Sequence, residues 1–145
     1  MNEAEKNCIF CKILRGEAES SMVAENDLCT AFLTIGPFNA GHTLVIPKRH
    51  AVTFTDLTPA EAAAMAKLAQ QVAAALEGSD LPSEGFNLWM ANGSAAGQDV
   101  FHAHMHVFPR LKGDNFRVEV TWPQPPRSEL DKVAGRIRAA LEAQA

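Results

Sequence analysis

Residues 100–110 read Val100-Phe101-His102-Ala103-His104-Met105-His106-Val107-Phe108-Pro109-Arg110, and this stretch decides the fold. Histidines alternate in it with apolar residues. Because side chains at positions i, i+2 and i+4 of a β-strand share one face, the alternation predicts a strand with three imidazoles in a row. The row concentrates three of the chain's five histidines, groups that titrate near neutral pH. The opposite face is expected to pack on a core and consists of Phe101, Ala103, Met105 and Val107.

The composition is typical of one soluble domain with its own core, at 145 residues and a net charge of -4. That charge argues against a nucleic-acid polymer as partner, because such proteins usually carry a basic surplus. No apolar run reaches the roughly 20 residues that a membrane-spanning helix needs, and the polar residues 1–7 do not resemble a secretory signal. Three cysteines, an odd number, favour the reducing cytoplasm over a disulfide framework.

Hydrophobic periodicity predicts the helices and the remaining strands. Thr58, Pro59 and Glu61 mark the start of a helix that ends at Gly78, and a second helix is predicted over residues 128–143. Because the strands come in closely spaced pairs, we predict an α+β domain with a five-stranded, mainly antiparallel sheet and two main helices. Besides the histidine strand, the predicted strands are residues 21–25, 28–33, 42–46 and 85–91.

The histidine row has three interpretations. It is a set of core groups that only hydrogen-bond, which requires partners for three adjacent imidazoles. It is a zinc site formed by the row itself. Or one imidazole is a nucleophile toward phosphorus, helped by its neighbours. Residues 93–98, Gly-Ser-Ala-Ala-Gly-Gln, favour the third, because the backbone N–H groups of such a small-residue loop can close on an oxyanion.

Three motifs, found in the same order, resemble those of the histidine triad (HIT) family. Residues 97–110 resemble its signature His-φ-His-φ-His-φ-φ, where φ is apolar, with Ala-Gly-Gln before it. Residues 37–50 and residues 8–13 match two further segments of the family. The resemblance implies a single HIT-like domain over residues 1–145, with a motif core at about residues 7–110 and a C-terminal extension and helix at residues 111–145.

The resemblance implies a nucleotidyl hydrolase or transferase. Such an enzyme cleaves at the α-phosphorus of a nucleoside phosphoramidate or a dinucleoside polyphosphate. His104 would be the nucleophile and would form a covalent nucleotidyl-histidine intermediate. His106 would contact the α-phosphate, and His102 would orient the site or bind a metal. His42 would support the triad from behind. A two-step displacement suits imidazole, which is neutral near pH 7 and leaves readily afterward.

The resemblance also places a nucleotide pocket at the N-terminal segment. Without it, six apolar residues there would be assigned to an ordinary core. They are Ile9, Phe10, Ile13, Phe32, Leu33 and Ile35. Gly97, Gln98 and Asp99 are expected beside the phosphates. Three positions depart from the family pattern and bear on substrate choice. Thr34 stands where Asp or Asn usually binds the ribose, Ala91 where an amide is frequent, and Asp99 where Ser or Thr is frequent.

Cys8 and Cys11 are separated by two residues, a spacing with three interpretations: a redox pair, two unrelated thiols, or half of a zinc site. The βαβ context of thioredoxin-like redox pairs is not evident. The family resemblance implies that His50 and His102 complete a four-ligand site. Such a Zn²⁺ would be structural, with no position left open for substrate.

Two rival functions and one assembly follow from the same motifs. The rivals are a zinc-dependent hydrolase whose metal is held by the histidine row, and a nucleotide-binding or signalling module with little turnover. The resemblance also implies a homodimer joined through the long helix and a neighbouring strand. The apolar stripe at residues 65–76 is equally compatible with packing inside one protomer.

Overall fold

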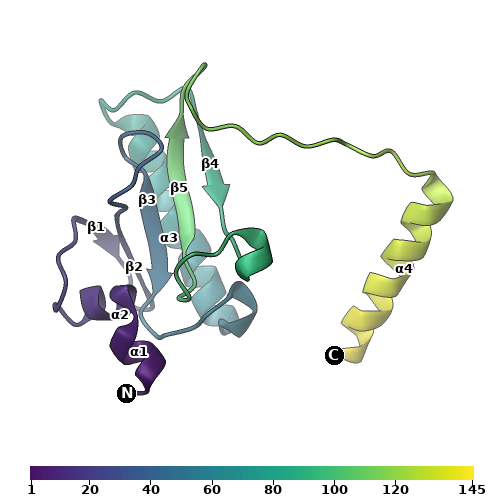
Figure 1. Ribbon diagram of the computed structural model, residues 1–145, viewed down its shortest axis with the longest axis horizontal. Helices are drawn as coiled ribbons and strands as arrows, with labels where there is room; N and C mark the ends of the chain where they lie inside the picture. Colours follow the sequence, from purple (N-terminus) through teal and green to yellow (C-terminus); the bar gives the residue numbers. More distant parts are fainter.

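The computed structural model describes residues 1–145 and centres on one five-stranded sheet with the order β1-β2-β3-β5-β4 (Figure 1). Every neighbouring pair of strands is antiparallel, so the predicted α+β class is confirmed. The strands are β1 (Met22–Glu25), β2 (Cys29–Leu33), β3 (Thr43–Pro47), β4 (Gly85–Trp89) and β5 (Met105–Arg110). The two main helices are α3 (Pro59–Gly78) and α4 (Arg127–Ala143). Two single-turn 3₁₀ helices are η1 (Phe54–Asp56) and η2 (Ser94–Ala96).

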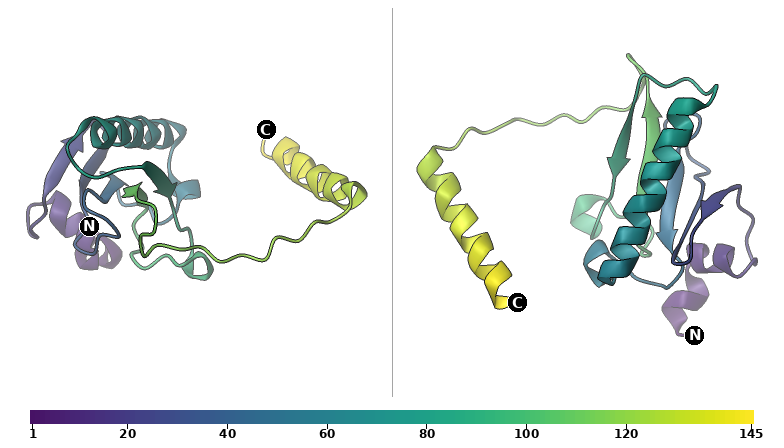
Figure 2. Two further views of the ribbon diagram at one scale, coloured as in Figure 1. Left: turned by 90° about the horizontal axis from the view of Figure 1, so that it is seen from above. Right: turned by 180° about the vertical axis from the view of Figure 1, so that it is seen from behind.

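Helix α3 covers one face of the sheet (Figure 2). It begins with a capping box, in which Thr58 Oγ1 accepts a hydrogen bond from Glu61 N–H and the Glu61 carboxylate accepts one from Thr58 N–H. The apolar stripe at residues 65–76 faces the sheet, so it packs inside the protomer and forms a core with residues of the strands. This core consists of Cys29, Ala31, Val45, Met65, Leu68, Ala69, Val72, Ala73, Leu76 and Val107.

The N-terminal segment lies on the opposite face, where it forms α1 (Glu3–Asn7) and α2 (Ile9–Leu14) (Figure 1). A smaller core seals this contact and consists of Phe10, Phe32, Leu44 and Ile46. Helix α1 was not predicted, because its five residues bury nothing and so show no periodicity. Asn2 and Glu5 form a capping box that is its only sequence signal.

The predicted histidine strand is wrong in its first half. Strand β5 begins at Met105, so only His106 lies in the sheet, while His102 and His104 precede it. The ladder with β3 ends at the pair Val45–Met105, and Ala103 N–H donates instead to the Ala51 carbonyl at 2.7 Å. The chain bends at residues 101–102, and residues 103–104 lie outside the ladder.

The predicted core face is correspondingly incomplete. Ala103 and Val107 are buried, and Met105 is half-buried, as expected. Phe101 is 53% exposed, contrary to the prediction, because it lies in the bend and not in the strand.

The C-terminal arm lies apart from the sheet (Figures 1 and 2). Phe116 still packs on Phe108 of β5, with ring centroids 5.1 Å apart, before the chain extends away without regular secondary structure. Helix α4 buries none of its residues. Its apolar side chains are between 40% and 59% exposed: Leu130, Val133, Ile137 and Leu141. Neither long helix combines the length and hydropathy that crossing a membrane requires.

Candidate functional site

A pocket opens between α2, β2 and the segment that leads into β5. It brings together ten of the residues predicted to bind a nucleotide. They are Ile9, Phe10, Ile13, Phe32, Leu33, Thr34, Ile35, Asp99, His104 and His106. The apolar members come from α2 and, far away in sequence, from β2 and the residues just after it, and they pack edge to face where Phe10 meets Phe32. A flat, apolar wall of this kind suits a nucleobase.

Sequence reasoning missed five further residues of this pocket: Glu19, Ser20, Ser21, Leu44 and Val100. Residues 19–21 precede β1 and reach the pocket only because β1 pairs with β2. The contact is made by Leu33 N–H, which donates to the Ser21 carbonyl at 3.0 Å. No local sequence motif predicts such a contact, because it depends on the register between the two strands.

His104 presents one defined nitrogen to the pocket. Its side chain is buried, and Nδ1 lies 2.7 Å from the carbonyl oxygen of His102. Because a carbonyl only accepts hydrogen bonds, Nδ1 carries the proton and Nε2 keeps its lone pair. The ring edge of Phe10 packs against the imidazole at a centroid distance of 5.2 Å. Position and tautomer are thus set before any ligand arrives.

His42 and His106 form a hydrogen-bonded chain that begins at the backbone. Phe38 N–H donates to His42 Nδ1 at 3.1 Å, so the proton of His42 is on Nε2. That nitrogen lies 2.8 Å from His106 Nδ1 and donates to it. His106 therefore carries its own proton on Nε2, where it can donate into the pocket. Its ring centroid is 5.0 Å from that of His104.

Burial keeps the two hydrogen-bonded imidazoles of His42 and His106 neutral. It lowers the pKa of His42 to about 4, and burial together with the nearby His104 lowers the pKa of His106 to about 4. Both rings are therefore uncharged near pH 7, which the directional chain of donors and acceptors requires. The arrangement delivers one neutral N–H donor and one lone pair to the same pocket.

The small-residue loop before the histidines is rigidly braced. Gly93 and Gly97 adopt positive φ values of 86° and 87°, on either side of η2. The Gln98 side chain accepts from Gly93 N–H at 2.8 Å and donates to the carbonyls of Val52 at 2.6 Å and Val100 at 3.0 Å. Gly97 and Gln98 do not line the pocket, and the Gln98 amide shapes the loop instead.

The structure shows the surroundings of all three departures from the family pattern. Thr34 lines the pocket, and its Oγ1 accepts a hydrogen bond from Gly36 N–H at 3.2 Å. Ala91 is buried, and the amide beside it, Asn92, accepts from Phe54 N–H at 2.7 Å. That amide serves the contact with η1. The third departure, Asp99, lies at the pocket mouth beside His104.

His102 faces away from this pocket, toward the two cysteines. Ligand atoms of Cys8, Cys11, His50 and His102 all lie within 4.8 Å of one another. His102 Nδ1 is 3.5 Å from both sulfurs, and His50 Nδ1 is 3.2 Å from Cys11 Sγ. Tetrahedral zinc with bonds of about 2.3 Å to sulfur and about 2.0 Å to nitrogen requires S···N separations of roughly 3.5 Å. These four residues are therefore placed to bind a metal ion.

Two further observations fit a metal bound at this site, the metal corner, which consists of Cys8, Cys11, His50 and His102. The Nε2–H of His102 donates to the Pro47 carbonyl at 2.9 Å, which leaves Nδ1 free as a ligand. Burial and the neighbouring Cys8 raise the pKa of the Cys11 thiol, so a cation is needed to hold two adjacent thiolates. The cluster contains one member of the histidine row. The row itself does not converge on a common metal position.

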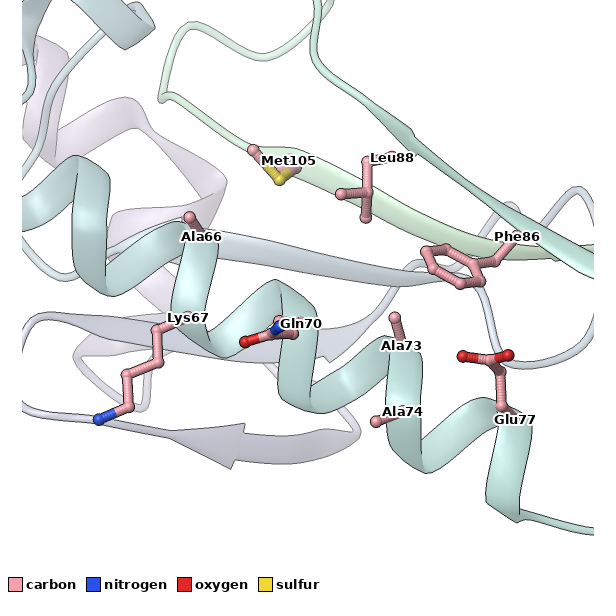
Figure 3. A pocket seen from close by; sticks show the side chains of 9 residues that line it. All are labelled: Ala66, Lys67, Gln70, Ala73, Ala74, Glu77, Phe86, Leu88 and Met105. Carbon is pink, nitrogen blue, oxygen red and sulfur yellow. The ribbon is translucent and has the colours of Figure 1, made fainter.

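A second hollow lies on the other face of the sheet, between α3, β4 and β5 (Figure 3). Its lining combines alanines and long polar residues of the helix with larger apolar residues of the strands. They are Ala66, Lys67, Gln70, Ala73, Ala74, Glu77, Phe86, Leu88 and Met105. It contains no histidine or cysteine, and it is separated from the histidines by the sheet.

Comparisons with known proteins agree with this geometry. A family model described as "HIT domain" matches residues 15–113. The chain is 39% identical over 110 residues to "Adenylylsulfatase HINT3" of Arabidopsis thaliana, covering 76% of this chain and 55% of that protein. The chain thus matches about half of the plant relative's length.

Solved structures give the same result. A HIT family protein from Bacillus anthracis superposes with a TM-score of 0.84 at 37% identity, covering 92% of this chain and 96% of that one. A Zn-bound histidine triad family protein from Mycobacterium smegmatis has a TM-score of 0.73 at 38% identity, covering 97% and 99%.

Proposed function

Because the chain belongs to the histidine triad family, we propose that it is a nucleotide hydrolase or transferase that works through His104. Its substrate is cleaved at the α-phosphorus of a nucleoside phosphoramidate or a dinucleoside polyphosphate. The proposal rests on one observation: the lone pair of His104 Nε2 faces the pocket, and the His102 carbonyl fixes that tautomer. Positioning of this kind removes much of the entropic cost of the reaction.

In the first step, the Nε2 lone pair of His104 forms a bond to the α-phosphorus while the bond to the leaving group breaks. The Nε2–H of His106 donates to a non-bridging phosphoryl oxygen and stabilises the charge that builds on it. In the second step, water attacks phosphorus, the imidazole leaves, and the nucleoside monophosphate departs. His42 is a positioning residue, because its donation to His106 Nδ1 directs the His106 proton toward the phosphate.

The metal corner has a structural role in this proposal. A Zn²⁺ held by Cys8, Cys11, His50 and His102 would tie the N-terminal segment to the histidines, and it would leave no coordination position for substrate. One residue connects the metal site to the nucleophile. The side chain of His102 would bind the metal, and its backbone carbonyl accepts the hydrogen bond from His104. Holding His102 in place therefore holds the nucleophile.

Trapping the intermediate tests the nucleophile. Wild type is mixed for milliseconds with phosphoramidates and dinucleoside polyphosphates of adenosine and guanosine, quenched in base and digested, since acid hydrolyses phosphoimidazoles. Mass spectrometry is expected to find one nucleotidyl group on the peptide that contains His104. The variant His104→Ala should carry none. Met105→Leu, a matched neighbour that lines the opposite hollow, should label like wild type.

Other outcomes discriminate between the functions. Turnover with the adduct on another residue would refute the assignment of His104. Binding without adduct or turnover for every nucleotide would support a binding module. Activity that disappears on zinc removal while the protein stays folded would support a zinc-dependent hydrolase.

The homodimer is also proposed, with the second copy covering the hollow of Figure 3 and the adjacent edge strand β4. Strand β4 is at the end of the sheet, and Phe86, Leu88 and Trp89 on it are each at least 39% exposed. An uncovered apolar edge is an open template for another strand, and a twofold axis lets two copies cover each other.

Light scattering during size-exclusion chromatography tests this assembly. Wild type should elute with the mass of two chains, and Leu88→Lys with the mass of one. The matched control Val23→Lys changes an exposed residue on β1, the other edge strand, and should stay dimeric. A monomeric wild type at about 100 μM, or a dimer that only the control dissociates, would show that β4 is not the interface.

A further inference from the structure

The pocket around His104 contains no lysine or arginine. Two charged side chains line it, Glu19 and Asp99, and both are acidic. Arg110, at the C-terminal end of β5, does not line the pocket and is engaged by Asp114, with nitrogen–oxygen distances of 2.8 Å, and by Asn87. A polyphosphate leaving group brings several negative charges, and nothing in this lining neutralises them.

Asp99 is held at the reacting centre. Its Oδ1 lies 3.6 Å from His104 Nε2, and the same oxygen accepts a hydrogen bond from Val100 N–H at 2.9 Å. The loop beneath it is braced by the three hydrogen bonds of Gln98. The Asp99 side chain is 82% exposed, so the carboxylate sits at the mouth of the pocket.

We propose that Asp99 selects the leaving group, favouring an amine and disfavouring phosphate or sulfate. This inference rests on the proposed nucleotidyl transfer to His104. An α-phosphorus about 3–3.5 Å from Nε2 would lie next to the Asp99 carboxylate. The bridging nitrogen of a phosphoramidate presents N–H donors to that carboxylate. A bridging oxygen presents only lone pairs, followed by the negative charge of the phosphate or sulfate beyond it.

The charge balance of the cleavage step explains the preference. The bridging nitrogen first takes a proton from solvent and becomes positive, which the Asp99 carboxylate stabilises. The His104 lone pair then forms the N–P bond, and the electron pair of the breaking P–N bond stays with the departing nitrogen. The amine leaves neutral. When water later hydrolyses the nucleotidyl-imidazole, one proton returns to solvent, so the carboxylate is unchanged over the cycle.

The variant Asp99→Asn tests the role of charge alone, because the amide keeps an Oδ1 acceptor for Val100 N–H. Two substrates with the same nucleoside are compared by kcat/KM: a phosphoramidate of a primary alkyl amine, and the corresponding phosphosulfate or dinucleoside polyphosphate. The ratio of amine to anionic substrate should fall roughly fivefold to twentyfold, as expected for one unit charge about 5 Å away near solvent. The fall should shrink in 1 M salt.

The control is Asp27→Asn, which removes the same charge at the turn between β1 and β2. That turn lies at the far end of the hairpin from Ser21 and Leu33, which line the pocket. Its ratio should stay within about twofold of wild type. An unchanged ratio in Asp99→Asn would overturn the inference while leaving the nucleophile untouched.

A binding measurement separates this inference from the proposed function. By calorimetry, Asp99→Asn should bind the nucleoside monophosphate several-fold more tightly than wild type and bind the nucleoside equally well. That result stands even if no substrate is cleaved, in which case the proposed enzyme is wrong but the charge effect is real. Equal monophosphate affinities in both proteins would refute the selection by charge.

Discussion

His102 and His104 are two residues apart in the chain, yet they present opposite nitrogens to different surroundings. The Nε2–H of His102 donates to the Pro47 carbonyl, so its Nδ1 faces two sulfurs. The Nδ1–H of His104 donates to the His102 carbonyl, so its Nε2 faces the pocket. In each case one backbone carbonyl decides which nitrogen is left free. A single motif thus supplies a metal corner and a reactive pocket.

Identical side chains thus acquire different roles from their hydrogen-bond partners and neighbours. The metal corner offers sulfur and two Nδ1 atoms at separations that suit tetrahedral coordination. The pocket offers a lone pair and a neutral donor, both backed by defined acceptors. If this division is right, changes in the pocket should affect turnover, and changes at the metal corner should affect stability.

The largest effect is expected for His104→Ala. Turnover should fall by at least about 10⁴-fold, because loss of a covalent nucleophile removes the whole two-step route. Nucleotide affinity, zinc content and the thermal midpoint should stay near those of wild type, measured by calorimetry, metal analysis and circular dichroism. A variant that loses its zinc would contradict the separation between the two regions.

Next in size is Cys11→Ser, which removes a ligand of the metal corner. The free energy of unfolding should fall by about 3–5 kcal/mol, in the range for loss of a metal site, and bound zinc should disappear. Urea denaturation with and without a chelator measures this. The chelator should destabilise wild type and leave Cys11→Ser unchanged. Cys29→Ser, at a buried cysteine in the α3 core, is the control, and it should keep its zinc.

The smallest effect concerns how stability depends on pH through the neutral, hydrogen-bonded imidazoles of His42 and His106. Burial holds the pKa of folded His42 at about 4 against 6.5 in the unfolded chain. The unfolded state therefore binds more protons between these values, and stability falls as pH drops from 6.5 toward 4. From pH 7 to pH 5, wild type should lose about 1–2 kcal/mol more than His42→Gln.

Urea titrations at the two pH values check this difference. Because both proteins contain the metal corner, its own acid sensitivity cancels in the comparison. Parallel losses in wild type and variant would show that His42 is not held neutral by the fold.

Much of the sheet was predictable from residue patterns. The strand segments 28–33 and 42–46 were placed within one residue of β2 and β3, because short, mainly apolar runs between turn residues leave few alternatives. The start of α3 was recognised from Thr58 and Glu61, whose side chains form the capping box that their spacing indicates. These features depend on neighbours within four residues.

The errors share one cause. The alternation at residues 100–106 is compatible with a strand, but the ladder ends at Met105, because Ala103 bonds to Ala51 and His102 turns to Pro47. Glu19 and its neighbours reach the pocket through strand pairing. Both differences depend on a partner far away in sequence. Helix α4, in contrast, was predicted correctly, although it buries none of its residues.

The amino-acid sequence by itself determined the family, the fold class and the identity of the cysteines and histidines that can do chemistry. Those properties are carried by residue type and spacing, which need no third dimension. Only the tertiary structure decided which imidazole nitrogen of each histidine is free, where the histidine strand begins, and that residues 19–21 reach the pocket. Such choices follow from distances of about 3 Å between groups brought together by folding, and hydrogen bonding at that range is what assigns protons and charges.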